Sequence, residues 1–197
     1  MISNVTRSAV SFKELLNKKY HIVIGKKGKE VDIDLEFMPV DFHHLAGLHK
    51  LKDLRLARDN RETVFLGIIN GFIDDEFLTK SRYYDIVKDR IFLLTKLESL
   101  LDGNEVIFRY YKKRSSFSVI DASYLFSVLD NEKTVYIFVD KRDELNRKFF
   151  CRSFFPYKDI DYAQGQERWT LLYKEKINVD TGESVIQYQH PSYKPQK

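Results

Sequence analysis

The sequence predicts an α+β fold, in which an N-terminal hairpin and several helices precede a curved antiparallel sheet. Two observations predict it: apolar residues recur at helical spacing mainly within residues 9–101, and short β-rich runs fill residues 105–178. A length of 197 residues with 43% hydrophobic residues is enough for one substantial core. We therefore expect a single domain over residues 1–197, with its core at about 9–188 and a loose tail at 189–197.

The first two elements are a short helix and a hairpin. Residues 9–18 carry apolar side chains at near-helical spacing, which predicts an amphipathic helix. Residues 20–25 and 30–37 are β-rich runs on either side of a glycine-containing turn at 25–28, so they predict a hairpin. Apolar and acidic residues alternate along 30–37, which gives the hairpin one buried face and one acidic face.

Three further helices are predicted before the sheet. Pro39 ends the hairpin arm, and Asp41 can cap a helix over 42–53. Apolar residues on one helical face predict a helix over 61–72 and a longer one over 81–101. The strands of the sheet are then expected at residues 105–111, 117–120, 123–129, 134–140, 147–155 and 169–178.

The composition argues against membrane and secreted classes of protein. No window of the chain approaches eighteen uncharged apolar residues, which excludes a membrane-spanning helix. The N-terminal residues lack a basic segment followed by an apolar run, so we expect no secretory signal. The single cysteine, Cys151, cannot form an internal disulfide or a multi-cysteine zinc site. We therefore expect a cytoplasmic protein with no membrane partner.

The basic residues are concentrated in the second half of the chain, although the net charge is only +4. One cluster contains Arg109, Lys112, Lys113 and Arg114, and a second lies within residues 141–152. Both clusters stand beside aromatic residues. Cations interleaved with rings suit a polyanion that also offers bases for stacking, whereas solvated strand faces are the structural explanation of the same pattern.

Residues 39–49 are the most distinctive stretch, because three histidines and a glycine follow a strand there. His43, His44 and His49 have spacings of one, five and six residues, which differ from the three- or four-residue spacing of paired zinc ligands on a helix. Histidines at a helix start can instead face a phosphate, since free N–H groups attract anions and imidazole transfers protons. In the structural alternative, one histidine lies in the core and two face solvent.

Three segments of the chain resemble the signature of a known nuclease group. They are Phe42-His43-His44-Leu45-Ala46-Gly47-Leu48 after a hairpin arm that ends Phe37-Met38-Pro39, Arg152-Ser153-Phe154-Phe155 on a late strand, and Trp169-Thr170-Leu171-Leu172-Tyr173. The group is the phage-associated Barnase–EndoU–colicin–RelE-like nuclease domains of the fourth type, found in mobile elements of Gram-positive bacteria. The resemblance covers most of residues 20–178. It implies an RNase-toxin-like α+β domain whose antiparallel sheet cradles RNA, and cleavage without a metal or other cofactor.

Such cleavage needs a general base for the 2′-hydroxyl, a general acid for the leaving 5′-oxygen, and a cation for the phosphorane. His44, with His43 as the alternate, is the expected acid or base, and Arg152 is the expected phosphate ligand. Ser153 is the fourth candidate, although neighbouring strand residues face opposite ways unless a bulge intervenes. The expected partner is RNA, and an antitoxin or another protein is a further option. The candidate substrate-binding residues are Lys50, Lys52, Arg109, Tyr110 and Lys112.

Two other functions fit parts of the sequence. Alternating carboxylates in residues 30–36 can hold Mg²⁺ against a phosphodiester, in which case EDTA would abolish the activity. A nuclease-like domain that has lost its chemistry can also act by binding and inhibiting a host or phage protein. The turn at 25–28 lacks the spacing of a phosphate-binding loop, and Cys151 lies in an apolar run that favours a structural thiol.

Overall fold

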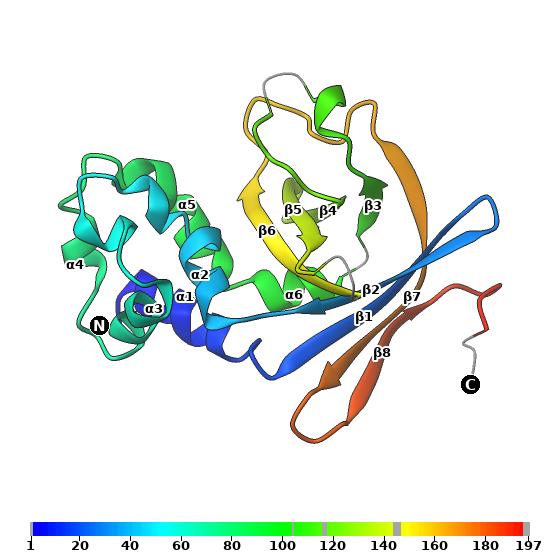
Figure 1. Cartoon of the computed structure of the whole chain (residues 1–197), viewed down its shortest axis with the longest axis horizontal. Coiled ribbons are helices and arrows are strands. Elements are labelled where there is room, and N and C mark those ends of the chain that lie inside the picture. Colours follow the sequence, from blue (N-terminus) through cyan, green and yellow to red (C-terminus); the bar gives the residue numbers. More distant parts are fainter. Residues whose placement is uncertain (1, 104, 116–117, 144–146, 195–197) are drawn as a thin grey trace. The chain divides into compact units, whose positions relative to one another are not determined.

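The computed structural model describes residues 2–103, 105–115, 118–143 and 147–194, which form two compact units (Figure 1). The helical unit consists of Met1–Leu16 and Met38–Glu98, and the sheet unit consists of Asn17–Phe37 and Ser99–Lys197. Helices and strands are therefore segregated along the chain, with an N-terminal hairpin inserted between the helices. This arrangement confirms the predicted α+β class.

The helical unit contains α1 (Asn4–Lys13), α2 (Pro39–Leu45), α3 (Arg61–Ile69), α4 (Asp75–Leu78) and α5 (Tyr84–Leu94), with the short 3-10 turns η1 (Leu48–Lys50) and η2 (Arg55–Ala57). Helix α6 (Leu97–Asp102) begins in this unit and ends in the sheet unit. The sheet unit contains β1 (Lys18–Lys26), β2 (Lys29–Glu36), β3 (Val106–Arg109), the 3-10 turn η3 (Lys112–Arg114), β4 (Tyr124–Asp130), β5 (Lys133–Lys141), β6 (Lys148–Pro156), β7 (Glu167–Asn178) and β8 (Ser184–Gln189). Within the described ranges, no helix is long and apolar enough to cross a membrane.

Three phenylalanine rings form the centre of the helical unit. Phe12 of α1, Phe42 of α2 and Phe65 of α3 are buried. The ring centroids lie 5.2 Å apart for Phe42 and Phe65, 5.7 Å for Phe12 and Phe42, and 6.1 Å for Phe12 and Phe65. These separations lie within the range of favourable edge and tilted ring contacts. Val87 and Ile91 of α5 are buried as well. Four helices thus share one apolar centre.

Helix α1 begins five residues earlier than the predicted helix over 9–18. The prediction missed this start because hydrogen-bonded caps set it, and an apolar pattern does not reveal such caps. The Ser3 hydroxyl accepts a hydrogen bond from the Thr6 N–H at 3.2 Å. The carboxylate of Asp75, distant in sequence, accepts the N–H groups of Asn4 at 2.7 Å and Val5 at 3.0 Å. These acceptors satisfy the free donors of the first turn and so set where the helix starts.

The predicted helix over 42–53 is wrong, because α2 ends after Leu45 and the 3-10 turn η1 follows. The reason is Gly47, whose φ of 77° lies in the left-handed region that terminates helices. Pro39 begins α2, as the restricted backbone of proline favours. His43 and His44 therefore lie in the last turn of α2 rather than at a helix start. The dipole at that end attracts cations, so the expected anion-binding helix start does not exist.

We expect Gly47→Ala to lower the free energy of unfolding by about 1–3 kcal/mol, because two costs add there. The left-handed φ of 77° disfavours any side chain, and an added Cβ would lie 3.0 Å from Cγ1 of buried Val87. Gly71→Ala is the matched control, since Gly71 has the same φ of 77° but no atom within 4 Å of the added Cβ. Chemical denaturation should show a smaller loss for Gly71→Ala. Equal losses would show that the contact with Val87 contributes nothing.

The predicted single helix over 81–101 is also wrong, because α5 ends at Leu94 and α6 starts at Leu97. Thr95 causes the interruption. Its hydroxyl donates to the Phe92 carbonyl at 2.8 Å, and its N–H donates to the same oxygen at 3.2 Å. Hydroxyl groups that bond to the local backbone compete with regular helix formation.

The N-terminal hairpin joins the later strands in one eight-stranded sheet (Figure 1). β1 and β2 are antiparallel across a two-residue turn, Lys27-Gly28, whose φ angles of 48° and 77° suit a tight hairpin. The strand order is β1-β2-β6-β5-β4-β3-β7-β8, and β7 also pairs with β1, so seven strands close into a ring. Among the described strands, β2 and β6 form the parallel pair and the other pairs are antiparallel.

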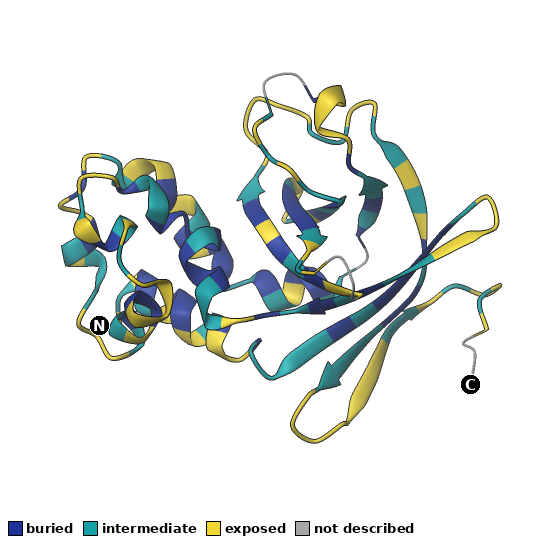
Figure 2. Cartoon of the chain, in the orientation of Figure 1, coloured by how far each residue is buried: buried dark blue, intermediate teal, exposed yellow. Residues whose placement is uncertain are grey.

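Apolar side chains that face one another across neighbouring strands fill the interior of this ring. The register places Ile22 opposite Ile33, Leu35 opposite Phe149, Val139 opposite Cys151, and Phe126 opposite Ile137. All eight are buried. Figure 2 shows buried segments, in dark blue, on strands of this sheet. Because the apolar set is continuous around the ring, burial of these side chains contributes most of the driving force for closing the sheet.

One charged side chain, Lys174 of β7, is also fully buried. Its ammonium group donates hydrogen bonds to the carbonyls of Leu101 at 2.8 Å and of Gly103, and to the Glu105 carboxylate at 2.7 Å. Burial raises the pKa of Glu105, and the lysine charge opposes that rise. Lys174 thus satisfies carbonyl groups at the C-terminus of α6 and attaches this helix end to β7.

The strand predictions hold for β3, β4, β5, β6 and β7 and fail at two other places. Within the predicted strand 117–120, residue 117 lies outside the described residues and 118–120 form no strand. The sequence does not predict β8, because the consecutive residues Val185 and Ile186 are both exposed and no apolar alternation marks the strand. Beyond β8, the ring of Tyr193 lies 5.8 Å from that of Tyr173.

Candidate functional site

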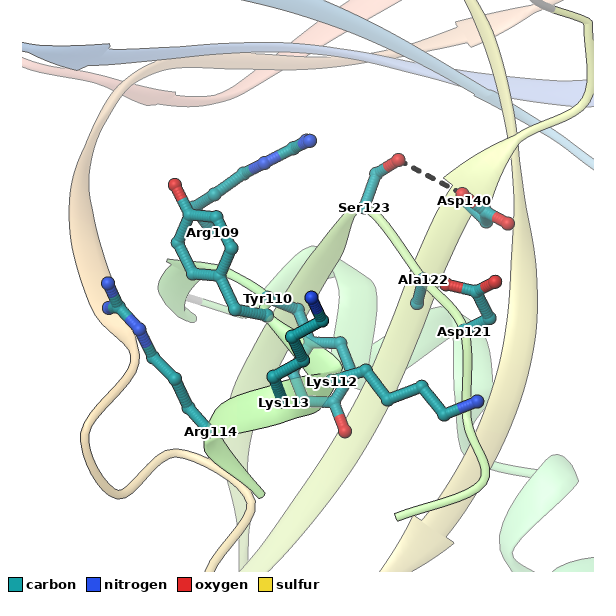
Figure 3. A pocket seen from close by; sticks show the side chains of 10 residues that line it. Arg109, Tyr110, Lys112, Lys113, Arg114, Asp121, Ala122, Ser123 and Asp140 are labelled. Atoms are coloured by element: carbon teal, nitrogen blue, oxygen red, sulfur yellow. Dashed lines mark hydrogen bonds between the residues drawn. The ribbon is translucent and has the colours of Figure 1, made fainter. Parts of the chain in front are cut away.

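The sheet unit contains a pocket of about 770 Å³ with a strongly basic wall (Figure 3). It is lined by Arg109, Tyr110, Tyr111, Lys112, Lys113, Arg114, Asp121, Ala122, Ser123 and Asp140. These residues come from the end of β3, turn η3, the segment before β4, and β5. Three of the five predicted substrate-binding residues, Arg109, Tyr110 and Lys112, are therefore brought together. The volume lies within the range of sites that hold a small molecule or a nucleotide.

Buried aromatic rings hold the basic wall onto the sheet. The ring of Tyr110 is 3% exposed and meets the ring of Phe138 edge-on, with 5.0 Å between centroids. Its hydroxyl donates to Ser118 Oγ at 2.7 Å. The guanidinium of Arg109 lies 5.0 Å from the centroid of the Tyr124 ring. Tyr110 thus anchors the chain between β3 and η3, and its buried ring leaves little surface for stacking on a base.

The neighbouring residue Tyr111 is the exposed aromatic residue of the pocket, with 39% of its surface accessible. The Arg114 guanidinium lies 4.4 Å from its ring centroid and donates to the Gly165 carbonyl at 3.2 Å. The Tyr111 hydroxyl donates to Glu167 Oε2 at 3.1 Å, and Lys26 contacts the other oxygen of that carboxylate at 2.8 Å. These contacts hold the Arg114 guanidinium over the ring of Tyr111.

Among the described residues, three cations of the pocket form no ion pair. Within the part of the chain that the structure describes, the side chains of Arg109, Lys112 and Lys113 have no carboxylate partner. Some other cations of the same unit are paired, as in Lys176–Asp102 at 2.6 Å. Adjacent unpaired cations repel one another, so a polyanion that binds them is favoured by the relief of this repulsion.

Arg152, the predicted phosphate ligand, lies beside this pocket. Its Nη1 is 3.6 Å from Oδ2 of Asp140, which lines the pocket, and Ser123 Oγ donates to the other carboxylate oxygen at 2.9 Å. The register of β5 and β6 shifts at this point, with Phe138 opposite Ser153 and Val139 opposite Cys151. Arg152 is therefore the extra residue of a β-bulge. Its side chain is 44% exposed, whereas Ser153 is buried.

The histidine segment belongs to the helical unit, and His43 is buried in it. His43 Nε2 lies 3.0 Å from the Leu56 carbonyl oxygen, and the residue is 2% exposed. Burial lowers the pKa of His43, because the charged imidazolium loses its hydration. His43 thus has the environment of a core histidine. The sequence left this alternative open for one of its three clustered histidines.

His44 and His49 stack face to face, with ring centroids 4.4 Å apart and planes inclined by 10°. Burial, reinforced by neighbouring positive charge, lowers the pKa of His49 to about 4, so this ring is neutral at neutral pH. Lys50 ends η1 and Lys52 follows it. The predicted catalytic residues are thus divided, with His43 and His44 in the helical unit and Arg152 and Ser153 in the sheet unit. Their predicted convergence on one cleft stays a prediction.

Three carboxylates of the acidic hairpin arm contact basic side chains of the sheet unit. Asp32 contacts Arg147 at 2.8 Å, Glu36 contacts Lys148 at 3.2 Å, and Asp34 lies 2.8 Å from His21 Nδ1. The hydrogen bond with Asp34 raises the pKa of His21, and the same bond lowers the pKa of Asp34. Among the described residues, no three His, Cys, Asp or Glu side chains are grouped to hold a metal ion.

Sequence reasoning missed Asp121, Ser123 and Asp140, the other side of the basic pocket. No local pattern marks them, because they reach the pocket only through the pairing of β4 with β5 and β3. The pairing of His21 with Asp34 was also missed, but the sequence carries a signal for it. A two-residue turn at Lys27-Gly28 fixes the hairpin register and so places position 21 opposite position 34.

Comparison with known proteins assigns a family to almost the whole chain. A family model described as phage-Barnase-EndoU-ColicinE5/D-RelE like nuclease4 matches residues 4–190. This match contains the segments on which the sequence resemblance rests. No curated protein and no solved structure matches the chain.

Proposed function

Because the chain belongs to the fourth family of phage-associated Barnase–EndoU–colicin–RelE-like nucleases, we propose that it is an endoribonuclease that needs no metal ion. In this reaction the 2′-hydroxyl attacks the adjacent phosphorus, the bond to the 5′-oxygen breaks, and a 2′,3′-cyclic phosphate remains. The protein must take one proton, supply another, and stabilise the charge of the phosphorane. A nuclease family implies a nucleic-acid substrate, and the choice of RNA is part of the proposal.

The observation that carries the proposal is the pocket with unpaired cations. Arg109, Lys112 and Lys113 have no carboxylate partner among the described residues and converge on one cavity of about 770 Å³. The backbone of a nucleic-acid strand presents phosphates to such cations at regular intervals. Binding also releases the counterions of those phosphates, which favours the complex. The exposed ring of Tyr111 suits a base or ribose beside those phosphates.

We assign the phosphate contact during cleavage to Arg152 and proton transfer to His44. Arg152 is exposed beside the pocket at the β-bulge, and a guanidinium can bind two phosphate oxygens at once. Ser153 is 7% exposed, which leaves its hydroxyl little access to a substrate. His43 is buried with a lowered pKa, so His44 is the better acid or base of the two. Lys50 and Lys52 remain candidate RNA contacts of the helical unit.

The deciding experiment is an RNA cleavage assay in EDTA with the purified full chain. We expect single-stranded RNA to be cut to products with cyclic phosphate ends, and a DNA of the same sequence to stay intact because it lacks the 2′-hydroxyl. Activity that appears only with added Mg²⁺ would contradict the metal-independent mechanism. Intact RNA of several types with folded protein would contradict the nuclease proposal, and would favour a binding protein that has lost its chemistry.

Removing single cations of the pocket should weaken binding in a salt-dependent way. We expect Lys112→Ala and Arg109→Ala each to reduce the slope of log affinity against log salt by about 0.7–1, the contribution of one phosphate contact. Fluorescence anisotropy with single-stranded DNA measures this without cleavage. Lys133→Ala, at an exposed lysine of β5 outside the pocket, is the matched control and should leave the slope unchanged. Equal slopes for all variants would exclude the pocket as the phosphate-binding surface.

A further inference from the structure

The pocket has a carboxylate side as well as a basic side, and this combination is informative about its ligand. Figure 3 shows Asp121 and Asp140 across the pocket from Arg109 and Arg114. A site that bound only phosphates would be weakened by carboxylates, because like charges repel at this range. The ligand that fits both sides therefore carries an anionic group and also hydrogen-bond donors.

The two carboxylates differ in what they already bind. Asp140 accepts a hydrogen bond from Ser123 at 2.9 Å and contacts Arg152 at 3.6 Å, so both of its oxygens are engaged. Asp121 has no hydrogen-bond or ion-pair partner within the described ranges, although Lys112 and Lys113 line the same pocket. Its two oxygens are thus available to accept donors from a ligand.

We infer that the pocket recognises a guanine nucleotide, with the guanine base on Asp121 and its phosphate on Arg109, Lys112 and Lys113. This inference rests on the proposed function and names the base that the site prefers. Guanine is the standard base whose pairing edge presents two neighbouring donors, the N1–H and the N2 amino group, which match the two oxygens of a carboxylate. Adenine and cytosine place an acceptor beside their amino group, and uracil places its single N–H between two carbonyls, so these bases direct acceptors at Asp121.

The geometry around Asp121 also provides for the rest of a nucleotide. The volume of about 770 Å³ accommodates a base, a ribose and a phosphate together. The exposed ring of Tyr111, held against Arg114 at 4.4 Å, is a flat surface of the kind on which bases stack. Stacking is tolerant of base identity, so in this arrangement the preference for guanine comes from Asp121.

Calorimetric titration of the full chain with GMP, AMP, CMP and UMP at low salt tests the inference. We expect GMP to bind about 10- to 100-fold more tightly than the other three, the usual discrimination of a two-bond base contact. Asp121→Asn should abolish this preference, because an amide replaces one acceptor by a donor, and the loss of the negative charge should not weaken the binding of AMP. Asp180→Asn, at an exposed turn residue outside the pocket, makes the same charge change and should leave the preference intact.

Equal affinities for the four nucleotides, no binding of any of them, or a preference for GMP that survives in Asp121→Asn would each overturn the inference. Circular dichroism checks that both aspartate variants are folded. Cleavage is measured separately. RNA that is cut without preference for guanosine would contradict the guanine assignment and would agree with the nuclease proposal. Tight GMP binding without cleavage would support the guanine assignment and contradict the nuclease proposal.

Discussion

Replacing His44 by alanine should lower the rate of RNA cleavage by about 10²–10⁴-fold, the usual loss when a general acid or base is removed. His44 is the candidate because burial withdraws His43 from proton transfer, with Nε2 already 3.0 Å from the Leu56 carbonyl oxygen. Initial rates with a short RNA in EDTA measure the effect. In cells, expression of the native chain without a protective partner should slow growth, and His44→Ala should relieve that effect.

His190→Ala is the matched control for this experiment. His190 lies beyond β8, where its Nδ1 is 2.8 Å from Ser192 Oγ, and its loss should leave the rate within about twofold. Thermal unfolding of both variants separates loss of chemistry from loss of fold, because the side chain of His44 stacks on His49. Cleavage by folded His44→Ala at the native rate would remove His44 from the mechanism, and His21 would then be the histidine to test.

Replacing Lys174 by methionine should lower the free energy of unfolding by about 3–5 kcal/mol, the cost of leaving a buried charge without its partner. The side chains of Lys174 and Glu105 are 0% and 1% exposed, and the ammonium lies 2.7 Å from the carboxylate. Chemical denaturation at neutral pH measures the loss. The loss should shrink as the pH falls, because protonated Glu105 carries no charge that needs Lys174 as its partner. The folded-state pKa of Glu105 is raised, so the destabilisation caused by its buried charge is present above the unfolded-state pKa of Glu105 and is absent below it.

Two further variants make this test specific to the buried pair. The double variant Lys174→Met with Glu105→Gln should recover part of the loss, because no unpaired charge remains, while the carbonyls of Leu101 and Gly103 still lack their donor. Arg147→Met removes an exposed pair with Asp32 and should cost at most about 1 kcal/mol. Equal losses for Lys174→Met and Arg147→Met would contradict the role of Lys174 in attaching α6 to β7.

The fold class and most strands were predictable because they depend on local patterns. The alternation of apolar and acidic residues predicted β2, and the glycine-containing turn predicted the hairpin with β1. Five later strands followed from runs of β-branched and aromatic residues. The family resemblance was also readable, since it rests on contiguous segments that lie within the match over residues 4–190.

The helix boundaries were less predictable because single residues and distant partners set them. The φ of 77° at Gly47 ended α2 although apolar residues continue beyond it. The hydroxyl of Thr95 split a continuous apolar periodicity into α5 and α6. The start of α1 depended on Asp75, whose carboxylate accepts the first N–H groups from a position more than sixty residues away. Hydrophobic periodicity reports which face of a helix is buried, and it carries no information about such hydrogen bonds.

The sequence by itself determined the basic side of the candidate site, because Arg109 to Arg114 are neighbours along the chain and share one short segment. Only the tertiary structure decided that Tyr110 is buried, that Arg152 stands at a β-bulge, and that Asp121 lies across the pocket from those cations. The physical reason is the closed sheet. Its register brings β3, β4 and β5 together from separate parts of the chain, and register depends on every pair of strands at once.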